Sequence, residues 1–159
     1  MPFVHIRIAG SPLSSNQTRV LQAGATTLMA DIMRKKVELT AVLVEQPEVG
    51  GWSIGGVPVF LEAHLEVKVT AGTNTKDEKA RFVEQAHRLL GQVLGKTLPV
   101  ATYVVVDEIA PDAWGYDGRT QASRKKAADS VVTRPERSRM NDLFAIAAVM
   151  GDAMRLLTF

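Results

Sequence analysis

Pro2 is the residue whose chemistry depends most on its position, because it follows Met1 directly. Initiator methionine is normally removed before a small residue such as proline, and its removal would leave Pro2 with a free secondary amine. Burial in an apolar pocket lowers the pKa of such an amine, and a nearby cation lowers it further. An amine with a pKa near the working pH is an effective general base. The sequence therefore predicts that Pro2 can move a proton at a carbon beside a carbonyl.

Other chemistries have little support in the sequence. The chain has no cysteine, which excludes disulfides, thiolate catalysis and cysteine metal sites. The three histidines, His5, His64 and His87, do not have the spacing of a metal site. A formal net charge of +2 gives little reason to expect a nucleic-acid partner. Without a secretory signal or an apolar run of roughly 18 residues, we expect a cytoplasmic protein that does not bind membranes.

The elements that would position Pro2 are repeated along the chain. A shift of 62 residues superimposes Gly10 on Gly72, Arg19 on Arg81, Thr40 on Thr102, Trp52 on Trp114 and Gly56 on Gly118. The first strand of each half aligns at a shift of 61, which places Pro2 over Ala63. A shared offset over this span indicates a duplication. Only the first half can supply a free amine, because the nitrogen of Ala63 is part of the backbone.

Each half predicts a strand, a helix, a second strand and a short hairpin. Apolar and polar residues alternate over 3–9 and again over 64–69, as in half-buried strands. A helix of about 20 residues follows each of them, and in the second half Thr75 and Glu78 have the spacing of a capping box. Second strands are predicted at 41–44 and 102–106, and glycine-rich hairpins at 50–56 and 114–118.

The predicted fold class is α+β, with two tandem β-α-β units that form a four-stranded sheet. Both helices cover one face, and a C-terminal helical tail follows. Residues 1–120 form one domain, with repeats at about 2–60 and 63–120. Residues 121–159 are expected to be a basic linker and an amphipathic helix at about 140–157. The open face carries mixed side chains that predict a covering by other subunits: Phe3, His5, Arg7, His64, Glu66 and Lys68.

Met1-Pro2, an alternating strand, a helix, a strand and a Trp-Ser-Ile-Gly-Gly hairpin together resemble the 4-oxalocrotonate tautomerase family. A second copy follows, so residues 2–120 resemble a fused, tandem member of the tautomerase superfamily. The resemblance implies a cofactor-independent isomerase without a metal, in which Pro2 is the general base of keto–enol tautomerisation. Double-length members form trimers, so we expect a homotrimer. The implied substrate is a small 2-oxo or enol acid, a carboxylate.

The resemblance also suggests site residues, although the sequence departs from the family pattern. Trp52 and Trp114 match the family's hairpin aromatic and could wall the pocket, and Tyr103 could donate a hydrogen bond to an enolate oxygen. The family's two substrate-binding arginines are absent: one position falls at 11–13 or Thr73, the other at Leu43 or Tyr103. This departure argues against a dicarboxylate substrate.

Three cations are candidates to replace the missing arginines: Arg7, Lys68 and Arg119. Two other functions stay open. A dehalogenase, hydratase or decarboxylase of the same superfamily would use a protonated proline with an acid such as Asp107 or Glu108. A trimeric binding protein without catalysis would need none of these groups.

Overall fold

The computed structural model describes residues 1–47, 51–95 and 98–132. The first repeat contains β1 (Phe3–Ala9), α1 (Ser15–Asp31), the 3-10 helix η1 (Val37–Leu39), β2 (Ala41–Glu45) and the hairpin β3 (Ser53–Ile54) and β4 (Val57–Pro58). The second contains β5 (Glu62–Thr70), α2 (Lys76–Leu94), β6 (Tyr103–Ile109) and the hairpin β7 (Gly115–Tyr116) and β8 (Arg119–Thr120). The helix α3 (Gln121–Val132) follows. The predicted order of elements is confirmed in both halves.

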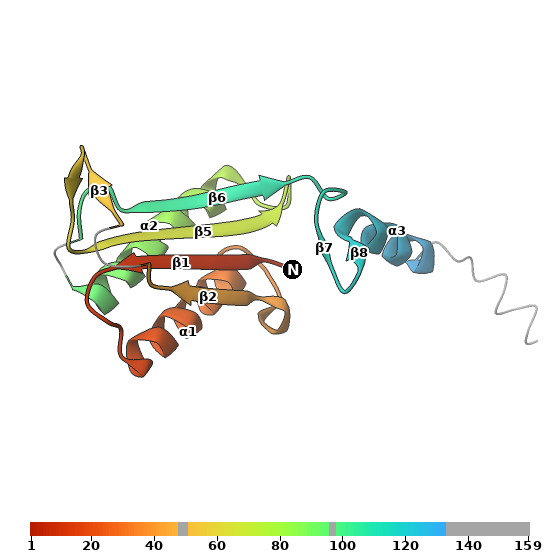
Figure 1. The fold of residues 1–159 in the computed structure, drawn as a ribbon. Helices are drawn as coiled ribbons and strands as arrows, with labels where there is room; N and C mark the ends of the chain where they lie inside the picture. The colour runs from red at the N-terminus through yellow and green to blue at the C-terminus, as the bar shows by residue number, and fades with distance from the viewer. Residues whose placement is uncertain (48–50, 96–97, 133–159) are drawn as a thin grey trace, which may run out of the picture. The chain divides into compact units, whose positions relative to one another are not determined.

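The four long strands form one mixed sheet in the order β2-β1-β5-β6. Within each repeat the two strands are parallel, whereas β1 and β5 are antiparallel, with Ile6 opposite Leu65. The two repeats therefore run in opposite directions across the middle of the sheet (Figure 1). As a consequence, the amino ends of β1 and β5 lie at opposite ends of the sheet.

The core lies between the sheet and the two helices, which cover the same face (Figure 1). Alternate residues of β1 and β5 are fully buried there, including Ile6 and Leu65, and they pack with Leu21 of α1 and Phe82 of α2. The predicted capping box is present, because Thr75 and Glu78 accept each other's backbone N–H groups. The alternation of apolar and polar residues in the strands thus predicts the buried face of the sheet correctly.

The opposite face of the sheet carries the expected polar side chains. His5 Nε2 donates to the Glu45 carboxylate at 2.7 Å, and Arg7 lies 3.6 Å from the same carboxylate. Lys68 forms ion pairs with Glu66 and with Asp107, the latter at 3.0 Å. Most charges on this face of the sheet are therefore neutralised by a neighbour on the same or an adjacent strand.

The C-terminal part contains a helix, as predicted, but this helix begins earlier in the chain than expected. The chain divides into two compact units, Met1–Gln121 and Ala122–Phe159. Residues 121–132 were expected to be a basic linker but form α3, since they contain alanines and neither glycine nor proline. The helix expected at about 140–157 lies outside the described residues. No helix in the described ranges is long and apolar enough to cross a membrane.

Candidate active site

Pro2 is buried at the amino end of β1. Its carbonyl oxygen accepts a hydrogen bond from the N–H of Ala41, at 3.3 Å, which ties it to the start of β2. On its other side lies β5, where Lys68 pairs with Phe3, the residue that follows Pro2. A buried position is the kind of environment in which an amine loses its proton more easily.

Lys35 lies at the same end of the sheet, and sequence analysis did not single it out. Its ammonium donates a hydrogen bond to the hydroxyl of Thr73 at 2.8 Å, and that hydroxyl donates to the carbonyl of Thr70 at 2.7 Å. Lys35 belongs to the loop that leads into β2, and Thr73 to the loop that leaves β5. Because β1 lies between β2 and β5, the Lys35–Thr73 bond crosses the end of β1 where Pro2 is located.

The charge of Lys35 is not compensated by a close carboxylate in the described part of the chain. Burial lowers the pKa of Lys35, and the adjacent Arg34 guanidinium lowers it further, against the opposite effects of Glu78 and Glu108. Glu78 pairs with Arg34 at 2.6 Å, and Glu108 pairs with Lys79 at 2.6 Å. Lys35 is therefore a half-buried cation with donors available for an anion.

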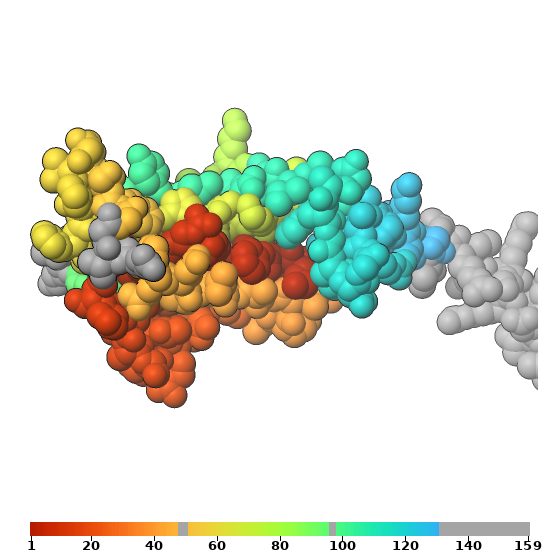
Figure 2. All heavy atoms as spheres, in the orientation of Figure 1, coloured from red at the N-terminus to blue at the C-terminus, as the bar shows by residue number. Residues whose placement is uncertain are grey.

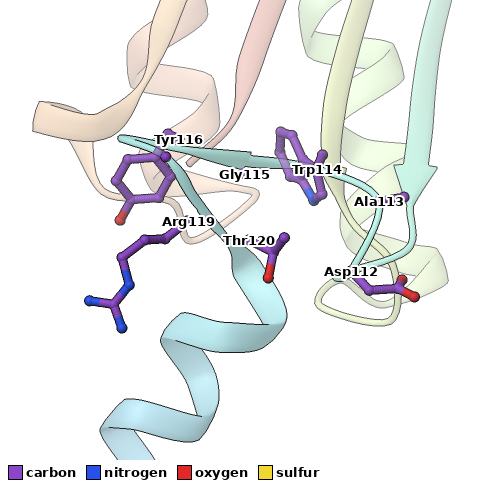
Figure 3. A pocket seen from close by; sticks show the side chains of 8 residues that line it. Asp112, Ala113, Trp114, Gly115, Tyr116, Arg119 and Thr120 are labelled. Carbon is purple, nitrogen blue, oxygen red and sulfur yellow. The ribbon is translucent and has the colours of Figure 1, made fainter.

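The hairpin β7–β8 leaves the sheet at the Pro2 end, because it follows β6, whose last residue pairs with Thr70. Figures 1, 2 and 3 all show this hairpin beside the start of β1. It borders a pocket of about 350 Å³, lined in part by Trp114 and Arg119 (Figure 3). Of the predicted site residues, Trp114, Arg119 and Lys68 thus lie at the same end of the sheet as Pro2.

Arg7, Tyr103 and Trp52 do not lie there in the same chain. Arg7 is five residues along β1 from Pro2, which corresponds to about 17 Å of strand. Tyr103 pairs with His64, which in turn pairs with Arg7, so these residues form one row at the far end of the sheet. Trp52 precedes the hairpin β3–β4 at that far end (Figure 1). These three side chains can reach Pro2 only if a second copy supplies them.

The candidate acids at the Pro2 end are both engaged. Asp107 accepts from Lys68 at 3.0 Å, and Glu108 accepts from Lys79 at 2.6 Å and from the N–H of Gly72 at 3.1 Å. The hydrogen bond from Lys79, followed by that from Gly72, holds the pKa of Glu108 below its usual range. Both carboxylates are therefore bound to neighbouring cations in the same chain.

Glu62, at the far end, is a buried carboxylate that sequence analysis also missed. Its Oε1 accepts from the Ala63 N–H at 2.9 Å and from the Thr102 hydroxyl at 3.1 Å, whereas its Oε2 has no partner among the described residues. Burial lowers the pKa of the nearby His64 imidazole, and Arg7 and His5 lower it further, so this imidazole favours its neutral form. Across the described ranges, no three acidic or histidine side chains are grouped as a metal site would require.

The sequence matches the family model of the tautomerase enzymes twice, over residues 2–60 and 64–123. The chain belongs to the tautomerase family. A curated relative of this tautomerase, the probable tautomerase K2 of Dickeya dadantii (strain 3937), is 39% identical over 59 residues. That match covers 37% of the present chain and 88% of the relative.

Solved structures support the tandem architecture of this tautomerase. A fused 4-OT asymmetric trimer (F6, wild type) matches with a TM-score of 0.68 at 18% identity, over 77% of the present chain and 98% of that chain. Pt0534 inactivated by 2-oxo-3-pentynoate matches with a TM-score of 0.70 at 11% identity, over 77% and 98% of the two chains. At these identities the likeness establishes the fold. The predicted family and the tandem β-α-β fold are both confirmed.

Proposed function

We propose that this tautomerase is a cofactor-independent isomerase that moves a proton between the keto and enol forms of a small 2-oxo acid. Pro2 serves as the base and then as the acid. The observation that supports the proposal is the burial of Pro2 at the end of the sheet where Lys35, a cation without a close carboxylate in the described part of the chain, bonds to Thr73. An apolar setting and a neighbouring positive charge both favour the neutral amine that a base requires.

The proposed reaction needs two proton transfers. The neutral amine of Pro2 takes a proton from the substrate carbon or hydroxyl, and the substrate becomes an enolate. Lys35 offers positive charge and hydrogen-bond donors to the anion, either at the enolate oxygen or at the carboxylate. The protonated Pro2 then returns the proton to the other end of the conjugated system. The ring of proline fixes the direction of the amine, which favours transfer along one path.

The working unit in this proposal is a homotrimer. The related fused 4-OT structures are trimers, and the polar face of the sheet offers a surface for other copies. In such an assembly a neighbouring copy would bring Trp52, Tyr103 or Arg7 towards Pro2, since these side chains lie at the far end of their own sheet. Arg119, Lys68 and Trp114 would come from the same chain as Pro2.

The engaged carboxylates favour an isomerase over the alternatives within the superfamily. A dehalogenase, hydratase or decarboxylase needs an acid that can meet water or substrate, but Asp107 and Glu108 are held by Lys68 and Lys79. A trimeric binding protein without catalysis stays a separate candidate. It would share the fold and the assembly but would not react with enols.

The test combines intact mass with a spectroscopic assay. Mass spectrometry reports whether Met1 has been removed, and ultraviolet absorbance follows the ketonisation of phenylenolpyruvate or 2-hydroxymuconate. We expect processed protein to accelerate ketonisation and Pro2→Ala to lose about 10²–10⁴-fold in rate, as expected for a general base. Processed protein that is inert to both enols, or a Pro2→Ala variant with full activity, would contradict the proposal.

A further inference from the structure

Lys35 differs from two other lysines at the Pro2 end of the sheet in the group to which its amine is bonded. Those two lysines donate to carboxylates: Lys68 to Asp107 at 3.0 Å, and Lys79 to Glu108 at 2.6 Å. The Lys35 amine donates instead to a neutral hydroxyl, that of Thr73, at 2.8 Å. Because a carboxylate at this distance stabilises the ammonium form of a lysine, Lys35 lacks, within the described ranges, the partner that would keep it protonated.

A like charge lies close to this amine. The Arg34 guanidinium donates to the carbonyl of Thr73 at 3.3 Å, so Thr73 binds both cations. Burial lowers the pKa of Lys35 and Arg34 lowers it further, whereas Glu78 and Glu108 act in the opposite direction. A lysine that is partly desolvated and lies near another cation is activated as a nucleophile.

Local hydrogen bonds fix the loop that carries the amine. Arg34 adopts the left-handed conformation (φ 55°) shortly after α1, and the N–H of Lys35 donates to the carbonyl of Met29 at 2.9 Å, which closes the end of the helix. The side-chain amide of Asn74, in the facing turn, donates to the carbonyl of Met33 at 3.0 Å. The amine is thus held in a defined place, and because Lys35 is only half-buried, a small molecule can reach it from solvent.

We propose that Lys35 is a nucleophile that forms a reversible imine with a small 2-oxo acid. The neutral amine adds to the carbonyl carbon, and one of its protons moves to the carbonyl oxygen to give a carbinolamine. The new hydroxyl takes a proton from solution and leaves as water, so that a protonated imine remains on the lysine nitrogen. The Thr73 hydroxyl accepts the remaining N–H, since its own hydrogen is donated to the carbonyl of Thr70 at 2.7 Å.

The imine gives Lys35 a covalent role that the proton transfer by Pro2 does not require. Its positively charged nitrogen draws electrons from the neighbouring carbons, as in other enzymes in which a lysine forms a Schiff base with a carbonyl substrate. The choice of a 2-oxo acid rests on the proposed function, whereas the covalent step does not involve Pro2.

Reductive trapping tests the inference. The protein is incubated at neutral pH with pyruvate and sodium cyanoborohydride, and peptide mapping by mass spectrometry locates the reduced adduct. Lactate, which has no carbonyl group, is the control compound. We expect most of the adduct on Lys35, its loss in Lys35→Arg, and its retention in Lys36→Arg, a change at the exposed neighbour in the same loop.

Thr73 provides a second pair of variants that keep the lysine. Thr73→Glu places a carboxylate beside the amine and should reduce labelling of Lys35 at least about tenfold, because an opposite charge stabilises the ammonium form. Thr73→Ser keeps the hydroxyl and should be labelled like the parent. Far-ultraviolet spectra and urea unfolding check that the variants are folded.

Equal labelling of Lys35 and Lys36 would overturn the inference, as would undiminished labelling in Thr73→Glu, the absence of any adduct, or an adduct confined to the amino-terminal residue. Labelled Lys35 in a protein that does not ketonise enols would sustain the imine site while the proposed function fails. Ketonisation by a protein that is not labelled at Lys35 would sustain the proposed function and overturn this inference alone.

Discussion

The ammonium nitrogen of Lys35 lies 2.8 Å from the hydroxyl oxygen of Thr73, and this hydrogen bond joins the two loops on either side of Pro2. One loop leads into β2 and the other leaves β5, so the bond closes the end of β1 between them. A cation without a close carboxylate among the described residues is thereby held at the same end of the sheet as the buried Pro2.

Lys35→Gln should raise KM for an enol acid about tenfold or more, because a hydrogen bond to a charged group contributes about 1.5–3 kcal/mol. Lys36→Gln is the matched control, since Lys36 is the exposed neighbour in the same loop. Steady-state kinetics at neutral pH measure both. Similar KM values in the two variants would exclude Lys35 from anion binding.

The pH dependence of this binding follows from the lowered pKa of Lys35, caused first by burial and then by Arg34. Only the ammonium form attracts an anion, and it is lost as pH rises through the lowered pKa. Affinity for the acid should therefore fall on the alkaline side earlier than for an ordinary lysine. Lys35→Arg should keep the affinity for the acid to higher pH, and profiles of KM against pH measure this. Coincident profiles for the variant and the parent would argue against Lys35 as the anion-binding cation.

Gly115→Ala should disrupt the β7–β8 hairpin without unfolding the sheet. A Cβ at this position would overlap the carbonyl of Arg119, which is backbone and cannot move aside. Gly91→Ala in α2 is the control, because its Cβ would meet only Leu98 at 3.9 Å. We expect at least a tenfold loss of carboxylate affinity in the first variant alone, with both unfolding in urea near the parent midpoint. Retained affinity in Gly115→Ala would mean that the hairpin geometry is not needed.

Glu78 should make the stability of the protein depend on acid pH. The backbone N–H of Thr75, helped by Asn74 and Arg34, lowers the pKa of Glu78 from 4.5 to about 2. A carboxylate with a lowered folded-state pKa stabilises the protein above its unfolded pKa, and this contribution is lost as pH falls from 4.5 through about 2. Urea unfolding at pH 7 and pH 2 should show Glu78→Gln destabilised mainly at pH 7. Glu84→Gln, at an exposed helical pair, should show little difference at either pH.

Thr102→Val should destabilise the protein by about 1–3 kcal/mol, because it removes a hydroxyl whose one hydrogen is shared between the buried carboxylate of Glu62 and the carbonyl of Pro99. Thr40→Val, at the equivalent position of the first repeat, removes a bond to the carbonyl of Lys36 near the surface and should cost less. Urea unfolding of the two variants compares them directly. A larger loss in Thr40→Val would indicate that the Glu62 carboxylate does not depend on Thr102.

Local sequence patterns predicted most of the helices and strands. The residues that these patterns missed depend on how distant segments of the chain pair in the sheet. Alternation in β1 and β5 and the Thr75–Glu78 spacing depend on neighbours in sequence, so they were predictable. Pro2 could be singled out as a candidate because the chemistry of its nitrogen depends on its position in the chain. Lys35 could not be singled out, because Arg34-Lys35-Lys36 resembles an ordinary surface run until the sheet order places its loop at the Pro2 end of the sheet. Glu62 was missed because sequence alone did not reveal that it would be buried.

The antiparallel pairing of β1 and β5 separates the starts of the two repeats by the length of the sheet. Two unfused half-length chains would each present a terminal amine. The duplicated chain has one amino terminus, and the nitrogen of Ala63 is part of a peptide bond. The start of the second repeat is consequently free to mutate without losing a reactive nitrogen. The second repeat can in this way acquire new side chains at its start, while the first repeat keeps the reactive nitrogen.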